Sequence, residues 1–163
     1  MTTLSRLETR HIRIYTDGGR HTDSNSAGFG IRIVSLLHND GKETILLNAT
    51  EGLANVSVSE AELTTVQEAL YRLEQEFKLQ IPHVCIFTDS KYTLHASTSP
   101  FFRKKHYYIV QEIQNIAHRI KRKSDLIKIV MHYVPSHIEN TSTGLRRKSS
   151  HHKFVQRPMI VLT

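Results

Sequence analysis

Three carboxylate side chains, Asp17, Glu62 and Asp89, lie where the sequence pattern ends a strand or begins a helix. Ligands of open α/β sheets gather outside the carboxyl ends of the strands. Asp17 and Asp89 would therefore converge if their strands are parallel neighbours, and Glu62 would join them from the first turn of a helix packed on the sheet. The three residues are candidates for one site.

Such a cluster has a specific chemistry. Mg²⁺ prefers oxygen ligands in proteins and keeps several of its waters. Two such ions about 3.5 to 4 Å apart can hold the attacking water and the leaving oxygen of a phosphodiester. A cluster of carboxylates would hold such cations and so meets this chemical need.

Each carboxylate also has a purely structural interpretation. Ser59 and Glu62 are spaced as a capping box, which would stabilise the start of a helix without any catalysis. Asp17 precedes a glycine and fits a turn, and Asp89 with Ser90 fits a helix cap. Three separate coincidences are needed to explain all three carboxylates in this way, which favours the shared site.

The first element expected to position these residues is a strand over His11–Asp17, where apolar and polar side chains alternate. Three of its side chains are able to face a core, namely Ile12, Ile14 and Tyr15. We expect the glycines that follow to end this strand. Two more strands are predicted over 27–37 and 42–49, joined by an Asn-Asp-Gly turn that favours an antiparallel hairpin.

From Ser59 the apolar residues recur every three or four positions, which predicts a helix to about Lys78. Its apolar stripe consists of Leu63, Val66, Leu70, Leu73 and Phe77. The apolar run Val84–Thr88 predicts a strand buried on both faces, as a βαβ crossover produces. We then expect a short helix over 90–97, a longer helix over 106–123 and a last strand over 127–134. The longer helix has its own stripe of Ile109, Ile113, Ile116 and Ile120.

Four motifs on these elements, in this order, resemble those of the type 1 ribonuclease H family. They are Tyr15-Thr16-Asp17-Gly18-Gly19, Ala61-Glu62-Leu63, Phe87-Thr88-Asp89-Ser90 and Tyr133-Val134-Pro135-Ser136-His137. The resemblance implies a ribonuclease H-like α/β domain over residues 10–140. Its mixed five-stranded sheet would have three antiparallel strands first and two parallel strands after them, flanked by helices. Residues 1–9 would be an N-terminal extension, and residues 141–163 an irregular basic tail.

The resemblance also implies an activity. The family cuts the RNA strand of RNA/DNA hybrids with two divalent ions, Mg²⁺ or Mn²⁺. Asp17, Glu62 and Asp89 would be the metal ligands, and His137 would match the family's loop histidine and carry protons. Further residues would contact the nucleic acid, namely Gly18, Gly19, Ser59, Ser90, Arg103, Lys104 and Lys105. The expected function is a monomeric, metal-dependent endoribonuclease.

One carboxylate of the family pattern has no counterpart here. The family has a fourth, an Asp shortly after the loop histidine, whereas no Asp follows Asp125 and Glu139 is the only later acidic residue. The alternative function is therefore a catalytically weak or inactive domain that binds nucleic acid. A third possibility is another nuclease or transferase, such as an exonuclease or an integrase-like enzyme, because a fold does not determine a function.

The net charge and the composition limit the classes of molecule that the protein is expected to bind. The chain of 163 residues has a formal net charge of +7, which attracts phosphate groups but also suits an anionic membrane surface. Basic residues gather around the longer helix, where they either contact phosphate or form a solvated face, and Tyr107 and Tyr108 beside them either stack or pack. No run approaches the roughly 18 apolar residues of a membrane span, and the expected partner is an RNA/DNA hybrid rather than a membrane. Cys85 is the sole cysteine, so no intrachain disulfide forms, which fits an intracellular location in the cytoplasm or nucleus.

Overall fold

The computed structural model describes residues 11–20, 27–36, 42–53, 55–76, 83–99, 104–123, 127–135 and 160–161. The helices of this part are α1 (Val58–Glu76), α2 (Lys91–Thr98) and α3 (Tyr107–Lys121). The strands are β1 (His11–Arg20), β2 (Ala27–Leu36), β3 (Glu43–Leu53), β4 (His83–Thr88), β5 (Lys128–Tyr133) and β6 (Ile160–Val161). The order of elements is the one that the hydrophobic pattern predicts, apart from β6.

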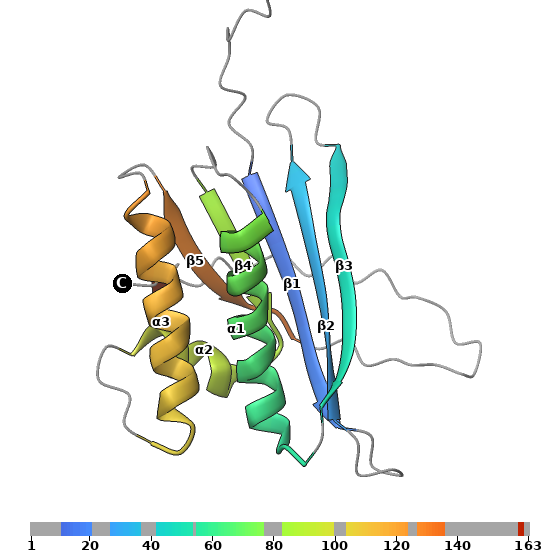
Figure 1. Cartoon of the computed structure of the whole chain (residues 1–163), viewed down its shortest axis with the longest axis vertical. Coiled ribbons are helices and arrows are strands. Elements are labelled where there is room, and N and C mark those ends of the chain that lie inside the picture. Colours follow the sequence, from blue (N-terminus) through green and yellow to red (C-terminus); the bar gives the residue numbers. More distant parts are fainter. Residues whose placement is uncertain are drawn as a thin grey trace, which may run out of the picture.

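All of these strands form one sheet in the order β3-β2-β1-β4-β5-β6 (Figure 1). The pairs β1–β2 and β2–β3 are antiparallel, whereas β1–β4 and β4–β5 are parallel. The predicted mixed five-stranded sheet is therefore confirmed. The sixth strand, β6, pairs antiparallel with Val130 and Met131 of β5. It was not predicted, because two residues are too few to show a period.

Strand β1 is longer than the sequence pattern indicated. The glycines Gly18 and Gly19 were expected to end it, but the strand continues through both to Arg20. Their partners in β2 are Phe29 and Gly28. The backbone pairing with β2 thus overrides the low strand propensity of glycine, which depends strongly on the surroundings.

The core lies between the sheet and the two longer helices, α1 and α3, which pack side by side on one face of the sheet (Figure 1). Ile12 and Ile14 of β1 are fully buried against this layer. The predicted apolar stripes of both helices are buried in it, namely Leu63, Val66, Leu70 and Leu73 of α1 and Ile109, Ile113, Ile116 and Ile120 of α3. The Arg119 guanidinium of α3 donates hydrogen bonds of 3.0 Å to the carboxylate of Glu74 on α1. This ion pair joins the two helices.

The opposite face of the sheet is less covered. Tyr15, one of the three side chains of β1 judged able to face a core, is instead 37% exposed. Strand β4 was expected to be buried on both faces, yet its burial alternates, with Val84 and Ile86 buried and Phe87 half-buried. The reason is that α1 and α3 pack on one face only. On the other face Tyr15, Phe87 and His132 stack in a row across three strands, with ring centroids 5.2 and 5.4 Å apart.

Some expectations fall outside the described residues, namely the Asn39-Asp40-Gly41 turn, Phe77, the extension 1–9 and nearly all of the tail 141–163.

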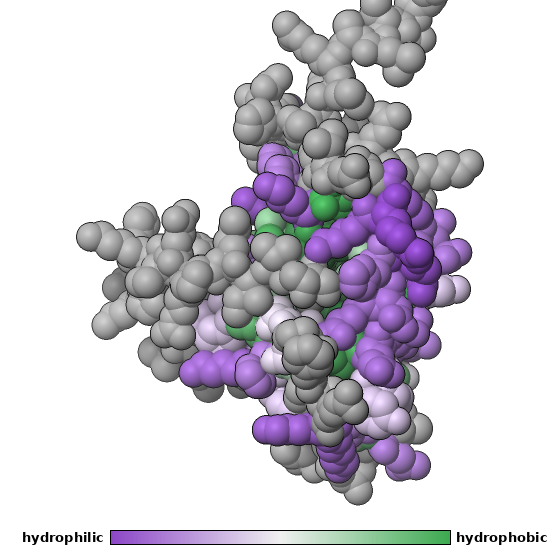
Figure 2. Space-filling model, turned by 90° about the vertical axis from the view of Figure 1, so that its left-hand side faces the viewer, coloured by the Kyte–Doolittle hydropathy of each residue, from purple (hydrophilic) through white to green (hydrophobic). Residues whose placement is uncertain are grey.

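Figure 2 looks onto the side on which α3 lies, where hydrophilic side chains make up most of the coloured surface. Among the described stretches, no helix combines the length and the apolar character that crossing a membrane requires.

Candidate active site

Asp17 and Asp89 are brought to the same edge of the sheet. Strands β1 and β4 are parallel neighbours with Tyr15 opposite Phe87, and Asp17 and Asp89 each lie two residues further along. The hydroxyl of Thr16 donates a hydrogen bond of 2.8 Å to the carbonyl of Phe87, which ties the two strands together just before the carboxylates. The predicted convergence therefore occurs. The turn interpretation of Asp17 is wrong, because the residue lies within β1 and pairs with Gly30.

The start of α1 differs from the predicted capping box. The backbone N–H of Glu60 donates to the hydroxyl of Ser57 over 3.2 Å, so Ser57 caps the helix and Ser59 does not. The carbonyl of Ser57 also accepts a hydrogen bond of 2.9 Å from the N–H of Ala61. Glu62 is thus one turn into the helix, and its carboxylate is free of a capping role. Ser59, a predicted nucleic-acid contact, is half-buried in the first turn.

Gly18 lets α1 approach β1 closely. A Cβ atom on Gly18 would lie 2.7 Å from the Cα and 2.8 Å from the backbone N of Glu62. A Cβ on Gly19 would meet nothing within 4 Å. Gly18 therefore sets how near Glu62 comes to the strand that carries Asp17, a packing role that its neighbour does not share. The role of both glycines in binding nucleic acid stays a prediction.

Ser90 connects the site to α2. Its hydroxyl oxygen accepts a hydrogen bond of 3.1 Å from the N–H of Thr93 and so caps α2. The same side chain hydrogen-bonds to Glu62, which lowers the pKa of that carboxyl. The cap that the sequence suggested is thus provided by Ser90, while Asp89 takes no part in it.

The three carboxylates influence one another electrostatically. Burial is the main cause that raises the pKa of Glu62, and the charges of Asp89 and Asp17 raise it further, against the effect of Ser90. Burial also raises the pKa of Asp89, and the charge of Asp17 adds to it. Charged carboxylates that disfavour one another in this way are relieved by a cation placed between them.

The donor set fits a divalent cation in its chemistry, because all three side chains offer the oxygen ligands that Mg²⁺ prefers. Within the described residues, however, no group of three or more His, Cys, Asp or Glu side chains is arranged to hold a metal ion as it stands. The fit to a divalent cation is therefore one of ligand chemistry, and the parallel pairing of β1 with β4 brings two of the three ligands to one edge of the sheet.

The other predicted site residues lie before α3 or outside the described part. Lys104 and Lys105 are exposed just before α3. His137 and Arg103 are not among the described residues. The sequence did not single out Lys91, whose ammonium lies 5.4 Å from the centre of the Tyr133 ring. The signal in the sequence that could have drawn attention to Lys91 is its position directly after Asp89 and Ser90.

The comparisons with known proteins agree with this geometry. Residues 9–145 match the model of the RNase H family. LC11-RNase H1, found in compost by a metagenomic approach and solved with an RNA/DNA hybrid, is 25% identical, with a TM-score of 0.57 over 76% of this chain and 85% of that one. The N-terminal RNase H domain of Rv2228c from Mycobacterium tuberculosis is 19% identical, with a TM-score of 0.57 over 77% and 88% of the two chains.

LC9-RNase H1, a type 1 RNase H with the type 2 active-site motif, is 16% identical, with a TM-score of 0.61 over 82% of this chain and 67% of that one. No curated protein is significantly similar to the chain. The family match covers most of the sequence and includes the positions of all three carboxylates. The chain therefore belongs to the RNase H family.

Proposed function

We propose that this chain cleaves the RNA strand of RNA/DNA hybrids and that Asp17, Glu62 and Asp89 bind the divalent ions, Mg²⁺ or Mn²⁺, that the reaction needs. The observation that carries the proposal is the position of these three carboxylates, which β1, the first turns of α1 and the end of β4 bring to one edge of the sheet. Their mutual effect on the pKa values of Glu62 and Asp89 agrees with this position. The substrate is supported by family membership and by the hybrid bound to LC11-RNase H1. One chain supplies all three carboxylates, so a monomer suffices.

The metal ions, when bound, would stabilise the attacking water and the leaving oxygen of the scissile phosphodiester. The protein's part is to hold the ligands. Gly18 sets the distance from Glu62 to β1, Thr16 ties β1 to β4, and Ser90 orients the carboxylate of Glu62. Because the pKa values of Glu62 and Asp89 are raised, protons compete with the cation for these groups at a higher pH than at ordinary carboxyls.

A second candidate function is binding of nucleic acid with little or no cleavage. It is favoured by the absence of any Asp after Asp125, since the family pattern has a fourth carboxylate in that region. Under this alternative the basic surface would bind the hybrid, and metal would be dispensable.

The deciding experiment incubates the protein with a labelled RNA/DNA hybrid in Mg²⁺, in Mn²⁺ and in chelator. Asp17→Asn and Asp89→Asn are compared with Glu43→Gln, which removes a carboxylate at the other end of the sheet, in an exposed ion pair with Arg13. We expect metal-dependent cleavage of the RNA strand alone, lost in both Asp variants and kept in the control. Binding of the hybrid by the folded protein without cleavage in either metal would favour the second function.

A further inference from the structure

Two exposed tyrosines at the start of α3 lie beside two exposed lysines. Tyr107 is 51% and Tyr108 57% exposed, and their rings meet edge to face with centroids 6.3 Å apart. Lys104 and Lys105 precede them, and both are exposed. We call these four residues the tyrosine platform. It combines aromatic faces in water with positive charge.

The platform is held in place by the residues around it. The hydroxyl of Tyr92 on α2 donates to the carbonyl of Lys105 over 3.0 Å, and the N–H of Tyr107 donates to the carbonyl of Lys104 over 3.1 Å. Between them His106 is buried and has a left-handed backbone, with φ of 69°. A surface ordered before binding loses less conformational entropy when a ligand arrives.

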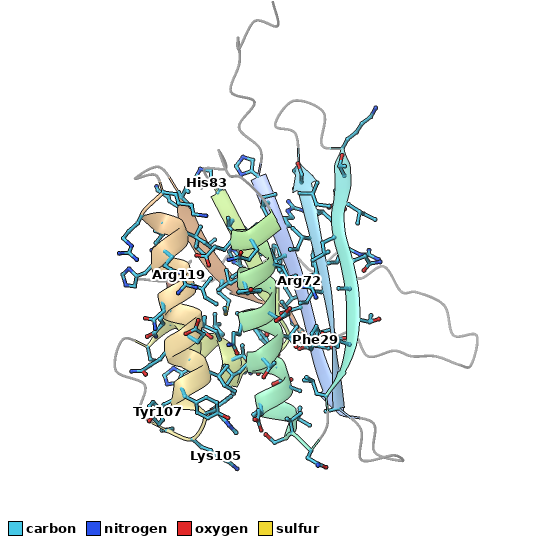
Figure 3. All side chains as sticks on the ribbon, in the orientation of Figure 1. Phe29, Arg72, His83, Lys105, Tyr107 and Arg119 are labelled. Carbon is cyan, nitrogen blue, oxygen red and sulfur yellow. The ribbon has the colours of Figure 1, made fainter. Side chains whose placement is uncertain are left out.

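The platform adjoins the end of the molecule that carries the candidate active site. The Tyr108 hydroxyl donates to the Glu60 carboxylate over 3.3 Å, in the first turn of α1 and two residues before Glu62. In Figure 3, Tyr107 and Lys105 lie at the N-terminal end of α3, and the N-terminal end of α1 is next to it. The two lysines of the platform outnumber the one neighbouring carboxylate, that of Glu60, so the net charge there is positive. A positive charge suits a phosphate backbone.

We propose that the tyrosine platform binds a single-stranded extension of the nucleic-acid substrate. Unpaired bases stack on Tyr107 and Tyr108 while Lys104 and Lys105 contact the phosphates. Aromatic side chains in a basic surface are the means by which proteins bind single strands, because every unpaired base offers a flat face. Bases inside a duplex are stacked on one another and offer no such face. The inference rests on the proposed function in one respect, namely that the single strand extends from an RNA/DNA hybrid bound at the active site.

The test measures binding in chelator, so that nothing is cut. Three labelled probes are used, namely a blunt RNA/DNA hybrid, the same hybrid with a single-stranded extension of about ten nucleotides, and the extension alone. The variants are Tyr107→Ala with Tyr108→Ala, and Lys104→Gln with Lys105→Gln. Tyr71→Ala is the matched control, because Tyr71 is 47% exposed but lies roughly 16 Å further along α1 than Glu60.

We expect the extension to tighten binding of the unaltered protein by at least about tenfold, the size of one stacking contact. The double tyrosine variant should lose this gain and bind the blunt hybrid as before, whereas Tyr71→Ala should keep it. The double lysine variant should bind the extension more weakly and depend less steeply on salt, since about two phosphate contacts are removed. This second variant tests the platform without altering the tyrosines.

Two results would overturn the inference. One is that the extension adds no affinity to the unaltered protein. The other is that the tyrosine and lysine variants, shown to be folded by a cooperative thermal transition, keep the gain or lose affinity for blunt and extended probes equally. A protein that neither binds nor cuts the blunt hybrid but binds the extension through the platform would refute the proposed function and leave this inference standing.

Discussion

Replacing Gly18 with alanine tests whether the spacing between β1 and α1 determines the geometry of the site. The new Cβ would lie 2.7 to 2.9 Å from three backbone atoms of Ala61 and Glu62, where ordinary contacts begin at 3.4 Å. Because these are backbone atoms, no rotation of a side chain relieves the clash. The start of α1 must move away from β1 by about 0.7 Å, the difference between 3.4 and 2.7 Å.

This displacement has two expected costs. Overpacking of this kind destabilises a protein by about 1 to 3 kcal/mol. It also carries Glu62 away from Asp17 and Asp89, and a misplacement of about 1 Å in a catalytic site can lower a rate by about 100-fold. We therefore expect Gly18→Ala to fold with reduced stability and to cleave the hybrid roughly 100 times more slowly.

The measurements are urea unfolding and the cleavage rate at saturating metal. Gly19→Ala is the control for stability, because a Cβ there meets nothing within 4 Å, and it should leave urea unfolding nearly unchanged. The reasoning is refuted if Gly18→Ala keeps the stability and the rate of the unaltered protein. It is also refuted if Gly19→Ala lowers the stability as much, since the loss would then come from replacing a glycine in a strand rather than from the approach of α1.

Two further predictions concern the charges and hydrogen bonds of the site. Burial raises the pKa of Asp89 in the folded protein, so its charged form disfavours folding and stability falls as pH rises through the interval between the unfolded and folded pKa values. In chelator at pH 7 Asp89→Asn should therefore melt at a higher temperature than the unaltered protein. Added Mg²⁺ should raise the melting temperature of the unaltered protein more than that of the variant. Equal melting temperatures of the two proteins in chelator would contradict the pKa shift. Ser90→Ala removes the cap of α2 and should cost about 1 kcal/mol in urea unfolding. It also removes the hydrogen bond that lowers the pKa of Glu62, so the acid limb of the pH–rate profile should move to higher pH, whereas Ser90→Thr should preserve the limb.

Local patterns were sufficient for the order of elements and for most of the core. The stripes of α1 and α3 follow from the helical period, because side chains three or four positions apart share one face of any helix. The sequence pattern also placed Glu62 near the start of α1 and Asp89 at the end of β4, whereas Asp17 lies within β1, which continues to Arg20. Their meeting at one edge was predictable only together with the parallel pairing of β1 and β4.

Other features depend on partners that are distant in the sequence. Strand β1 extends through Gly18 and Gly19 because β2 lies beside it, and Tyr15 stays partly exposed because the helices α1 and α3 cover only the opposite face. The sequence pattern suggested Ser59 as the cap of α1, whereas Ser57 caps the helix. Spacing alone does not distinguish the two serines, because each precedes an acidic residue by three positions.

The sequence by itself therefore determined the family, the element order and the three carboxylates, since these rest on residue types and on spacing along the chain. The tertiary structure alone decided the contact between Gly18 and Glu62, the hydrogen bond from Ser90 to Glu62, and the tyrosine platform next to α1. Those features are distances between segments far apart in the sequence, and they arise only when the packing of helices on the sheet brings the segments together.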